Sequence, residues 1–199
     1  MKKTVLALAL LAASAGAFAQ SFDTTDGNWL VRMRALRMDS ANKDSTGQDL
    51  SVNNKWIIAG DISYFFTPNL AVELLLGLPQ KLNVYSSGRQ IGTLRGLPPT
   101  VTLQYHFTGL GQFKPYVGVG LNYTHFSSVN LMGGAADVKR DSVGPALQVG
   151  TDFAVTKHVY LNLDIKKVWI KTEVSAGGRD LGSFKIDPWI IGVGIGYRF

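Results

Sequence analysis

The sequence predicts an all-β fold: an eight-stranded antiparallel transmembrane β-barrel with four long extracellular loops and three short periplasmic turns. Three observations indicate it. Apolar and polar residues alternate with a period of two from about residue 20 onward, and no segment of useful length has the 3.6-residue period of an amphipathic helix. Along the chain, long and short connections alternate between these segments. Aromatic residues gather on the apolar face, whereas ionisable residues gather on the opposite face.

The first residues have the order of a secretory signal peptide. Lys2 and Lys3 precede an apolar stretch from Val5 to Leu11, and Ala17-Phe18-Ala19 forms a small-x-small cleavage site. The apolar stretch is shorter than the roughly 20 residues that a membrane-spanning helix needs. We therefore predict a signal peptide over residues 1–19 and one outer-membrane barrel domain over residues 20–199.

Composition excludes several classes of function. The chain has no cysteine, so it has no disulfide framework, thiolate metal site or thiol nucleophile. The formal net charge is +6, and it falls to about +4 once Lys2 and Lys3 leave with the signal peptide. This surplus is spread along the chain without a Lys/Arg cluster that carries interleaved aromatics, so we expect no nucleic-acid partner.

The first two predicted strands carry charge on one face only. Over residues 29–36, Arg32 and Arg34 alternate with apolar residues, and over residues 56–66, Asp61 stands opposite an apolar face. Cations are costly on the lipid side of a membrane barrel. We therefore expect these side chains to face the lumen.

The third to sixth strands follow the same rule. Residues 70–76 come after a tight turn at 67–69 and direct Glu73 and Leu75 inward, and residues 99–107 direct His106 inward. Residues 116–123 set aliphatic residues against glycines, and residues 146–153 set them against Asp152. Each strand therefore has one apolar and one mixed polar face.

The last two strands complete the barrel. Residues 161–166 place Asp164 and Lys166 on the polar face, but Lys167 would then face lipid unless it lies at the rim or after a bulge. In residues 189–199 the alternation is cleanest, with Arg198 inward and Phe199 outward. An aromatic C-terminal residue on such a strand resembles the signal that the barrel insertion machinery of Gram-negative bacteria recognises.

The connections predict the topology. Four long polar segments, at residues 38–54, 79–97, 127–143 and 173–184, alternate with three short turns at residues 67–69, 108–112 and 155–158. An outer-membrane barrel with both termini in the periplasm has this arrangement.

The alternative is a water-soluble sandwich or lipocalin-like barrel, which would place its apolar face inside. The content of the two faces argues against it, because a soluble core could not hold this many ionisable groups at several kcal/mol for each poorly compensated buried charge. The ionisable residues expected in a lumen charge network are Arg32, Arg34, Asp61, Glu73, His106, Asp152, Asp164, Lys166 and Arg198. The apolar face carries aromatic residues near strand ends, as in membrane girdles.

Three segments carry a resemblance to a known family. They are Leu97-Pro98-Pro99 through Phe107, Lys114-Pro115-Tyr116 through Tyr123, and Ile186-Asp187-Pro188-Trp189 through Phe199. Over essentially the whole mature chain, the sequence resembles the outer membrane protein W family. The resemblance implies a narrow hydrophobic pocket that opens outward and the passage of small hydrophobic molecules, which leave sideways through the wall. The alternative is a structural or stress-responsive barrel that acts as a surface receptor without transport.

The resemblance also suggests pocket residues. Leu75 matches an inward leucine of the family that narrows the base of the pocket, and Lys166 stands where some relatives have a bulky aromatic residue. Leu97, Leu131 and Met132, with Leu50 and Leu94, are candidates for the pocket mouth. The alternative for Leu75 and Lys166 is plain packing and charge pairing in the lumen of a small barrel.

We expect neither catalysis, nor a metal, nor a cofactor. His106, His125 and His158 fall on different strands and turns, so no nucleophile, base and acid come within hydrogen-bond reach. We expect an integral protein of the Gram-negative outer membrane. Its expected partners are outer-membrane lipids and lipopolysaccharide, small hydrophobic solutes, the insertion machinery at the C-terminal strand, and a bacteriocin or phage at the loops.

Overall fold

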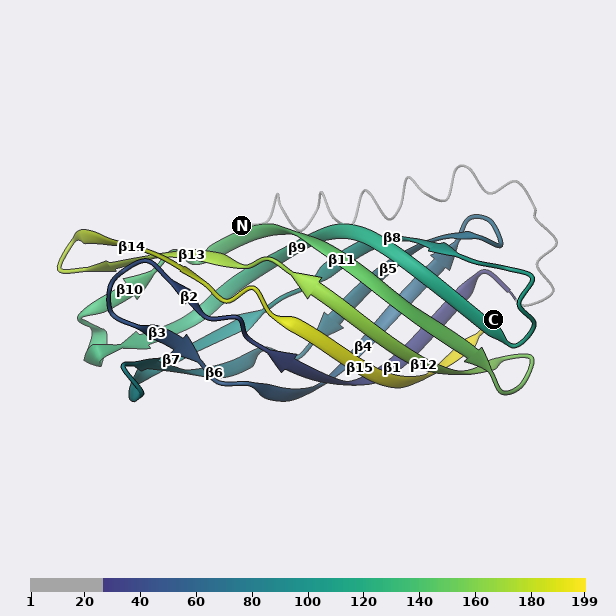
Figure 1. Cartoon of the computed structure of the whole chain (residues 1–199), viewed down its shortest axis with the longest axis horizontal. Coiled ribbons are helices and arrows are strands. Elements are labelled where there is room, and N and C mark those ends of the chain that lie inside the picture. The colour runs from purple at the N-terminus through teal and green to yellow at the C-terminus, as the bar shows by residue number, and fades with distance from the viewer. Residues whose placement is uncertain (1–26) are drawn as a thin grey trace.

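The computed structural model describes residues 27–199, apart from the side chain of Leu97. The predicted signal peptide lies outside the described residues. Eight antiparallel strands close into a ring in the order β11, β12, β15, β1, β4, β5, β8 and β9, and β9 pairs with β11 to close it (Figure 1). The predicted eight-stranded barrel is therefore confirmed. The ring strands are β1 (Trp29–Asp39), β4 (Lys55–Phe65), β5 (Leu70–Gly77), β8 (Thr100–His106), β9 (Phe113–Leu131), β11 (Asp141–Ala154), β12 (Val159–Val168) and β15 (Trp189–Arg198).

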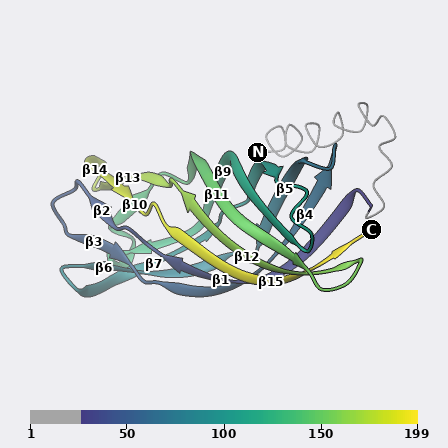
Figure 2. The same cartoon turned by 45° about the vertical axis from the view of Figure 1, so that its right-hand side comes forward.

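The long connections, predicted as loops, consist mostly of strands. They extend the wall beyond the ring at the end we call the upper end, on the left in Figures 1 and 2. Along this extension, β7 pairs with β6 and β9, and β13 pairs with β10 and β14. The added elements are β2 (Lys43–Asp44), β3 (Leu50–Val52), β6 (Gln80–Ser86), β7 (Arg89–Leu97), the short helix η2 (Met132–Gly134), β10 (Ala136–Val138), β13 (Lys171–Ala176) and β14 (Arg179–Lys185).

Between β2 and β3, side chains rather than a backbone ladder close the extension. The Asn42 amide donates to the Val52 carbonyl at 3.1 Å and accepts the Val52 N–H at 3.0 Å. Asn42 has a φ of 49°, a conformation that asparagine tolerates better than most residues. A side-chain amide thus replaces one rung of the backbone ladder.

At the lower end, backbone hydrogen bonds join the start of β1 to the end of β15. Trp29 and Phe199 each donate their backbone N–H to the other's carbonyl at 2.9 Å. Gly27, with a φ of 82°, lies so close to this pair that a Cβ there would stand 2.1 Å from the Phe199 carbonyl carbon. The first and last strands therefore need a glycine at this point.

The outer face of the wall is apolar and exposed, as expected of a surface in contact with lipid. Among its exposed side chains are Met33, Ile58, Leu121 and Val193, each more than half exposed. Aromatic pairs such as Trp29–Tyr64 and Tyr105–Phe107 mark the lower rim, with ring centroids 4.7 and 5.2 Å apart. Within residues 27–199 we find no helix that is long and apolar enough to cross a membrane.

The lumen is filled in three layers. The upper layer is apolar, the middle layer is ionic, and the lower layer is built around the packed side chains of Leu30, Phe65, Ala71 and Tyr160. Inward positions on each strand supply all three layers because side chains alternate between the two faces of a strand. The two upper layers form the candidate site.

Candidate functional site

Arg32 is the centre of the ionic layer. Its side chain is fully buried, and its guanidinium lies 2.8 Å from one oxygen each of Asp61, Glu73 and Asp152. It also donates to the Ser63 hydroxyl at 2.8 Å. Charge-assisted hydrogen bonds of this kind offset the large cost of burying the guanidinium.

Arg34 and Lys166 supply the other two cations of this layer. Arg34 Nη2 donates to Glu73 Oε2 at 2.9 Å, and its Nε lies 2.9 Å from Asp61 Oδ2 without the alignment of a hydrogen bond. Lys166 Nζ donates to Glu73 Oε1 at 2.6 Å. In the lumen, Lys166 is thus paired with Glu73 rather than with Asp164 of its own strand.

Uncharged side chains complete the network, and they are functional residues that the sequence alone did not indicate. Gln148 donates to Asp164 Oδ2 at 2.6 Å and to both oxygens of Glu73, and Gln104 donates to Glu73 Oε2 at 2.9 Å. The Tyr116 hydroxyl donates to Asp164 Oδ2 at 2.7 Å. Their inward positions were the available signal, but a glutamine on a polar face does not reveal its partner.

Two members of the predicted charge network lie one level lower. His106 packs its ring between Phe65 and Tyr116, and its Nε2 lies 3.0 Å from the Gln104 amide oxygen. Arg198 stacks 3.9 Å above the Phe65 ring and donates to the Gly27 carbonyl at 2.9 Å. Both side chains therefore belong to the floor beneath the ionic layer.

The ionic layer crosses the lumen from wall to wall. Its contacts join β1, β4, β5, β11 and β12, and the side chains of Arg32, Arg34, Glu73 and Lys166 have no exposed surface. A barrel of eight strands is narrow enough for its lumen to be filled by side chains. The axial route through the barrel is closed at this level.

Above the ionic layer, the lumen is apolar. Inward side chains from the ring and from the extension pack into one buried cluster, with Leu75 next above Glu73 on β5. Leu50, Leu94 and Leu131 belong to it, and each is 6% exposed or less. The other members include Leu36, Met38, Leu82, Val84, Phe126, Val138, Val168, Ile170, Val174, Phe184, Ile186 and Ile190.

Of the two remaining candidates for the pocket mouth, Met132 does not join this cluster, and the side chain of Leu97 is not described. Met132 lies in η2 at the upper tip and is 45% exposed, because the chain turns there and leaves the wall. The side chain of Leu97 lies outside the described part of the structure, although its backbone pairs with His125. Of the four predicted mouth residues whose side chains are described, Leu50, Leu94 and Leu131 reach the apolar lumen and Met132 does not.

The wall has a weak seam beside this lumen. The β5–β8 ladder ends with Leu75 opposite Thr100, and the next pairing across these segments, between β6 and β7, begins with Gln80 opposite Gly96. Pro98 and Pro99 lie between the two ladders and have no backbone N–H to donate. No ladder pair joins residues 76–79 to residues 97–99 in the part of the chain that the structure describes.

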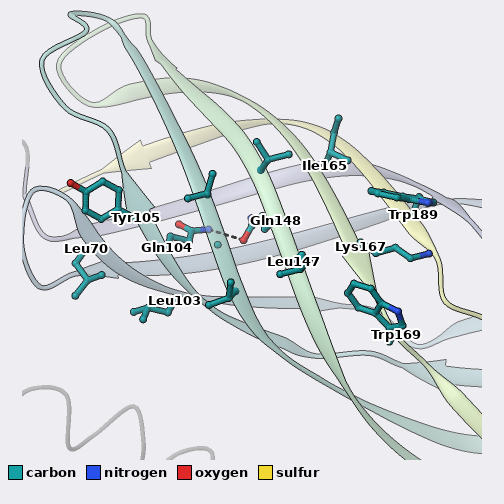
Figure 3. Close-up of a pocket in the computed structure, with 14 residues that line it drawn as sticks. Leu70, Leu103, Gln104, Tyr105, Leu147, Gln148, Ile165, Lys167, Trp169 and Trp189 are labelled. Atoms are coloured by element: carbon teal, nitrogen blue, oxygen red, sulfur yellow. Dashed lines mark hydrogen bonds between the residues drawn. The ribbon is translucent and has the colours of Figure 1, made fainter.

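A separate hollow of about 660 Å³ lies on the outer wall (Figure 3). Its walls are apolar side chains of β8, β9, β11 and β12, and its upper end is formed by Lys167, Trp169 and Trp189. The hydrogen bond from Gln104 to Gln148, 3.1 Å long, lies behind it where Gly118 has no side chain. This hollow opens to lipid, not to the lumen.

Residues 27–199 contain no group of three or more His, Asp or Glu side chains arranged to hold a metal ion. The two half-buried histidines, His125 and His158, are not placed for catalysis either. His125 Nδ1 lies 2.8 Å from Asp141, which also accepts the Tyr123 hydroxyl, and His158 Nδ1 lies 2.9 Å from the Arg198 carbonyl oxygen. These contacts lie at opposite ends of the barrel wall.

Comparison with known proteins agrees with this architecture. The family model described as "OmpW family" matches residues 25–199. An uncharacterised outer-membrane protein of Sinorhizobium fredii is 44% identical over 182 residues, which cover 86% of this chain and 80% of that protein. Outer membrane protein W of Vibrio cholerae is 34% identical over the full length of both chains.

A relative from Pseudomonas aeruginosa, named dibenzothiophene metabolism operon protein PahQ, is 31% identical over 76% of this chain and 74% of its own. Among solved structures, the outer membrane protein OprG of Pseudomonas aeruginosa superposes with a TM-score of 0.72 at 23% identity, covering 87% of this chain and 96% of that one. Outer membrane protein W of Escherichia coli gives a TM-score of 0.64 at 26% identity, covering 87% and 98%.

Proposed function

The chain belongs to the OmpW family of outer-membrane barrels, and on that premise we propose that it takes small hydrophobic molecules into its upper lumen and releases them sideways into the membrane. It is an integral outer-membrane protein with its long connections outside the cell, and it is not an enzyme. The observation that carries the proposal is the apolar lumen directly above a closed ionic layer.

The chemistry of the two layers favours apolar solutes. A solute that displaces the packed side chains of Leu94 or Leu131 loses contact with water and gains apolar contacts, at about 25 cal/mol for each Å² buried. Entry into the ionic layer is unfavourable for such a solute, because it would separate Arg32 or Lys166 from buried carboxylates. An apolar molecule would therefore stop above the ionic layer.

The seam in the wall supports a sideways exit. Opening a barrel between paired strands breaks backbone hydrogen bonds that lipid cannot replace. In the described structure, residues 76–79 share no ladder pair with residues 97–99, so opening the wall between these two segments breaks no such pair. Leu76 and Leu78 are exposed on the lipid side of this seam, so a solute that passes it enters an apolar environment.

The name of one relative supports an apolar aromatic heterocycle as the test solute. PahQ is named for a dibenzothiophene metabolism operon, and dibenzothiophene is a rigid apolar molecule without charge. We therefore use dibenzothiophene as the probe.

A reversible cross-link across the seam tests the proposal. Leu76 and Pro99 would form the next pair of the β5–β8 register after Leu75 and Thr100. Because the chain has no cysteine, the double variant Leu76→Cys and Pro99→Cys forms only the intended disulfide. We expect cells that make the oxidised variant to take up dibenzothiophene no faster than cells without the barrel, and reductant to restore uptake.

The matched control places the disulfide in the intact wall. Leu163 and Val193 are directly opposite each other on β12 and β15 and face lipid. The variant Leu163→Cys and Val193→Cys should take up dibenzothiophene at the same rate when oxidised and when reduced. Equal uptake by the oxidised and the reduced seam variant would contradict the proposal that the solute leaves sideways through the seam. Equal uptake by cells with and without the barrel would favour the alternative, a structural barrel or surface receptor without transport.

Three further kinds of partner belong to the proposal: the insertion machinery, lipopolysaccharide, and a bacteriocin or phage. Phe199 is 56% exposed at the end of the last strand, where its ring is accessible for binding by the insertion machinery. Lipopolysaccharide surrounds the upper rim, and the tips of the extension, such as η2 and the β13–β14 turn, are the surfaces that a bacteriocin or phage would meet first.

A further inference from the structure

Three lysines form a row across three adjacent strands of the upper extension. Lys43 on β2 is directly opposite Lys185 on β14, and Lys185 is directly opposite Lys171 on β13. All three side chains are exposed on the outer face, because their neighbours Thr172 and Phe184 point inward. Like charges directly opposite on paired strands destabilise a sheet.

No carboxylate of the described chain forms an ion pair with these lysines. The acidic groups near them have other partners. Asp44 accepts the N–H groups of its own loop, Glu173 lies 3.6 Å from Lys139, and Asp187 accepts the Ile170 N–H at 2.9 Å. The row is therefore a concentration of positive charge that an anion from outside the chain would relieve.

A fourth cation lies just below the row, among indole rings. Lys167 Nζ is 5.1 Å from the Trp189 ring centroid and 5.9 Å from that of Trp169, and it donates to the Asp187 carbonyl. Figure 3 shows Lys167 between the two tryptophans. Tryptophan is enriched at the boundary between hydrocarbon and polar headgroups, so this cluster marks the membrane surface. Trp169 lies two residues from Lys171, and Trp189 lies four from Lys185, so the lysine row stands at headgroup height.

Below Lys167, the apolar hollow of about 660 Å³ runs down the same wall. Its lining includes Val119, Leu147, Val149 and Ile165, which face lipid. An acyl chain would fit a groove of this chemistry. A phosphate on the same molecule would then reach the lysine row.

We propose that this wall binds one phosphorylated acyl lipid of the outer leaflet, the lipid A part of lipopolysaccharide. Its phosphate lies against Lys43, Lys171 and Lys185, its amide-linked sugar lies over Trp169 and Trp189, and one acyl chain lies in the hollow. This site is on the outer wall, and its existence does not depend on transport through the lumen.

The test compares two charge-matched pairs of exposed cations. Lys171→Gln with Lys185→Gln removes two directly opposite cations of the row. Lys81→Gln with Arg95→Gln removes two directly opposite cations on β6 and β7, where the hollow and its tryptophans are absent. Both pairs are exposed, so neither change disturbs the buried layers.

Binding is measured by native mass spectrometry of the whole folded barrel in detergent with added bisphosphorylated lipid A. At about 1 kcal/mol for each lysine near an anionic headgroup, we expect about 30-fold weaker binding by the Lys171/Lys185 variant and little change in the Lys81/Arg95 variant. Lipid A without phosphate should bind the unaltered barrel as weakly as the row variant does. Inorganic phosphate at millimolar concentration should not compete, because it lacks the acyl chain.

Several results would overturn the proposal. Equally weakened lipid A binding in both variants would show that lipid A is attracted to exposed cations in general and has no specific site at the lysine row. Unaltered lipid A binding by the Lys171/Lys185 variant would show that the lysine row does not bind the phosphate. Full competition by inorganic phosphate would show a site for free phosphate rather than for lipid. A further variant, Val119→Trp, fills the hollow and leaves the lysines in place; unchanged lipid binding by it would exclude the acyl-chain part of the site.

Discussion

Lys166 and Glu73 meet at the barrel axis, where Lys166 Nζ lies 2.6 Å from Glu73 Oε1. The two residues are 93 positions apart in sequence, and their strands, β12 and β5, stand four places apart in a ring of eight. This ion pair therefore spans the lumen from one wall to the opposite wall. Because the ion pair occupies the lumen, the axial route through the barrel is closed at this level.

Loss of the lysine charge should destabilise the barrel. Lys166→Met leaves a buried carboxylate with one cation fewer, and breaking a buried pair costs about 3 kcal/mol or more. We expect a drop of that size in the free energy of unfolding, measured by urea titration in lipid vesicles. The double variant with Glu73→Gln should recover part of it, because the number of unpaired charges falls. Lys157→Met, at an exposed turn, is the control and should change the unfolding free energy by under about 0.5 kcal/mol. A Lys166→Met barrel as stable as the control would show that the pair contributes nothing.

A polar group in the upper lumen should weaken solute binding. Leu94 is 1% exposed within the apolar cluster, and Leu94→Asn introduces an amide that an apolar solute cannot satisfy, at a cost of about 1–3 kcal/mol. We expect about ten-fold weaker binding of dibenzothiophene by fluorescence titration of the barrel in detergent. Met132→Asn, at the exposed tip, should bind as the unaltered barrel does. Retention of the folded form on unheated gels separates this effect from unfolding, and equal affinity in both variants would argue against a pocket lined by Leu94.

The loop after β2 should loosen in acid. Burial would raise the pKa of Asp44, but hydrogen bonds from the backbone N–H groups of Thr46, Gln48 and Leu50 and from the Thr46 hydroxyl outweigh it and lower the pKa below its usual range. A carboxyl whose folded pKa is lowered stabilises the fold above its unfolded pKa of about 3.9 and loses that contribution as the pH falls through the folded value.

Amide hydrogen exchange checks this loop. The Leu50 amide should exchange faster as the pH falls below about 4, after correction for the intrinsic rate. Asp44→Asn should show the faster exchange already at neutral pH, because an amide oxygen accepts fewer of these hydrogen bonds. Asp49→Asn is the control in the same loop. Protection at Leu50 that is unaltered in Asp44→Asn would contradict the assignment.

Phe199 should matter for assembly more than for the finished fold. Its backbone closes the ring against Trp29, but its side chain is 56% exposed. We expect Phe199→Ala to fold spontaneously in detergent at the normal yield, and to accumulate in the outer membrane of cells at a reduced level. Phe153→Ala, at an exposed aromatic near the same end, should accumulate normally. Equal accumulation of both variants would mean that the terminal aromatic ring is not read during insertion.

The ring of eight strands could be predicted from the sequence because each strand shows its two faces directly. Arg32 and Arg34 fall on one face of a single strand, and a barrel in lipid has only one place for such a face. The phase beyond Lys167 could not be predicted, because it depends on a neighbour. Lys167 faces outward at the rim, where two indole rings and the Asp187 carbonyl hold its ammonium group.

The upper extension and the partners within the lumen were harder to predict. Residues 79–97 and 173–184 are polar on average, yet Leu82, Val84, Val174 and Phe184 point inward and continue the wall. Because their outward residues are polar, the two-residue alternation of apolar and polar side chains in these segments is clear only once the neighbouring strands are known. Likewise, the pairing of Lys166 with Glu73 depends on the ring order, which no local pattern contains.

The most direct test of the central claim is to locate a bound solute by solid-state NMR of the barrel in lipid bilayers, using dibenzothiophene and methyl-labelled protein. An apolar lumen above a closed ionic layer predicts contacts to the methyl groups of Leu94, Leu131 and Val138 and to those of Leu76 and Leu78 at the seam. Contacts to Leu30, below the ionic layer, would contradict the account, because the solute would then have passed along the axis through Arg32 and Glu73.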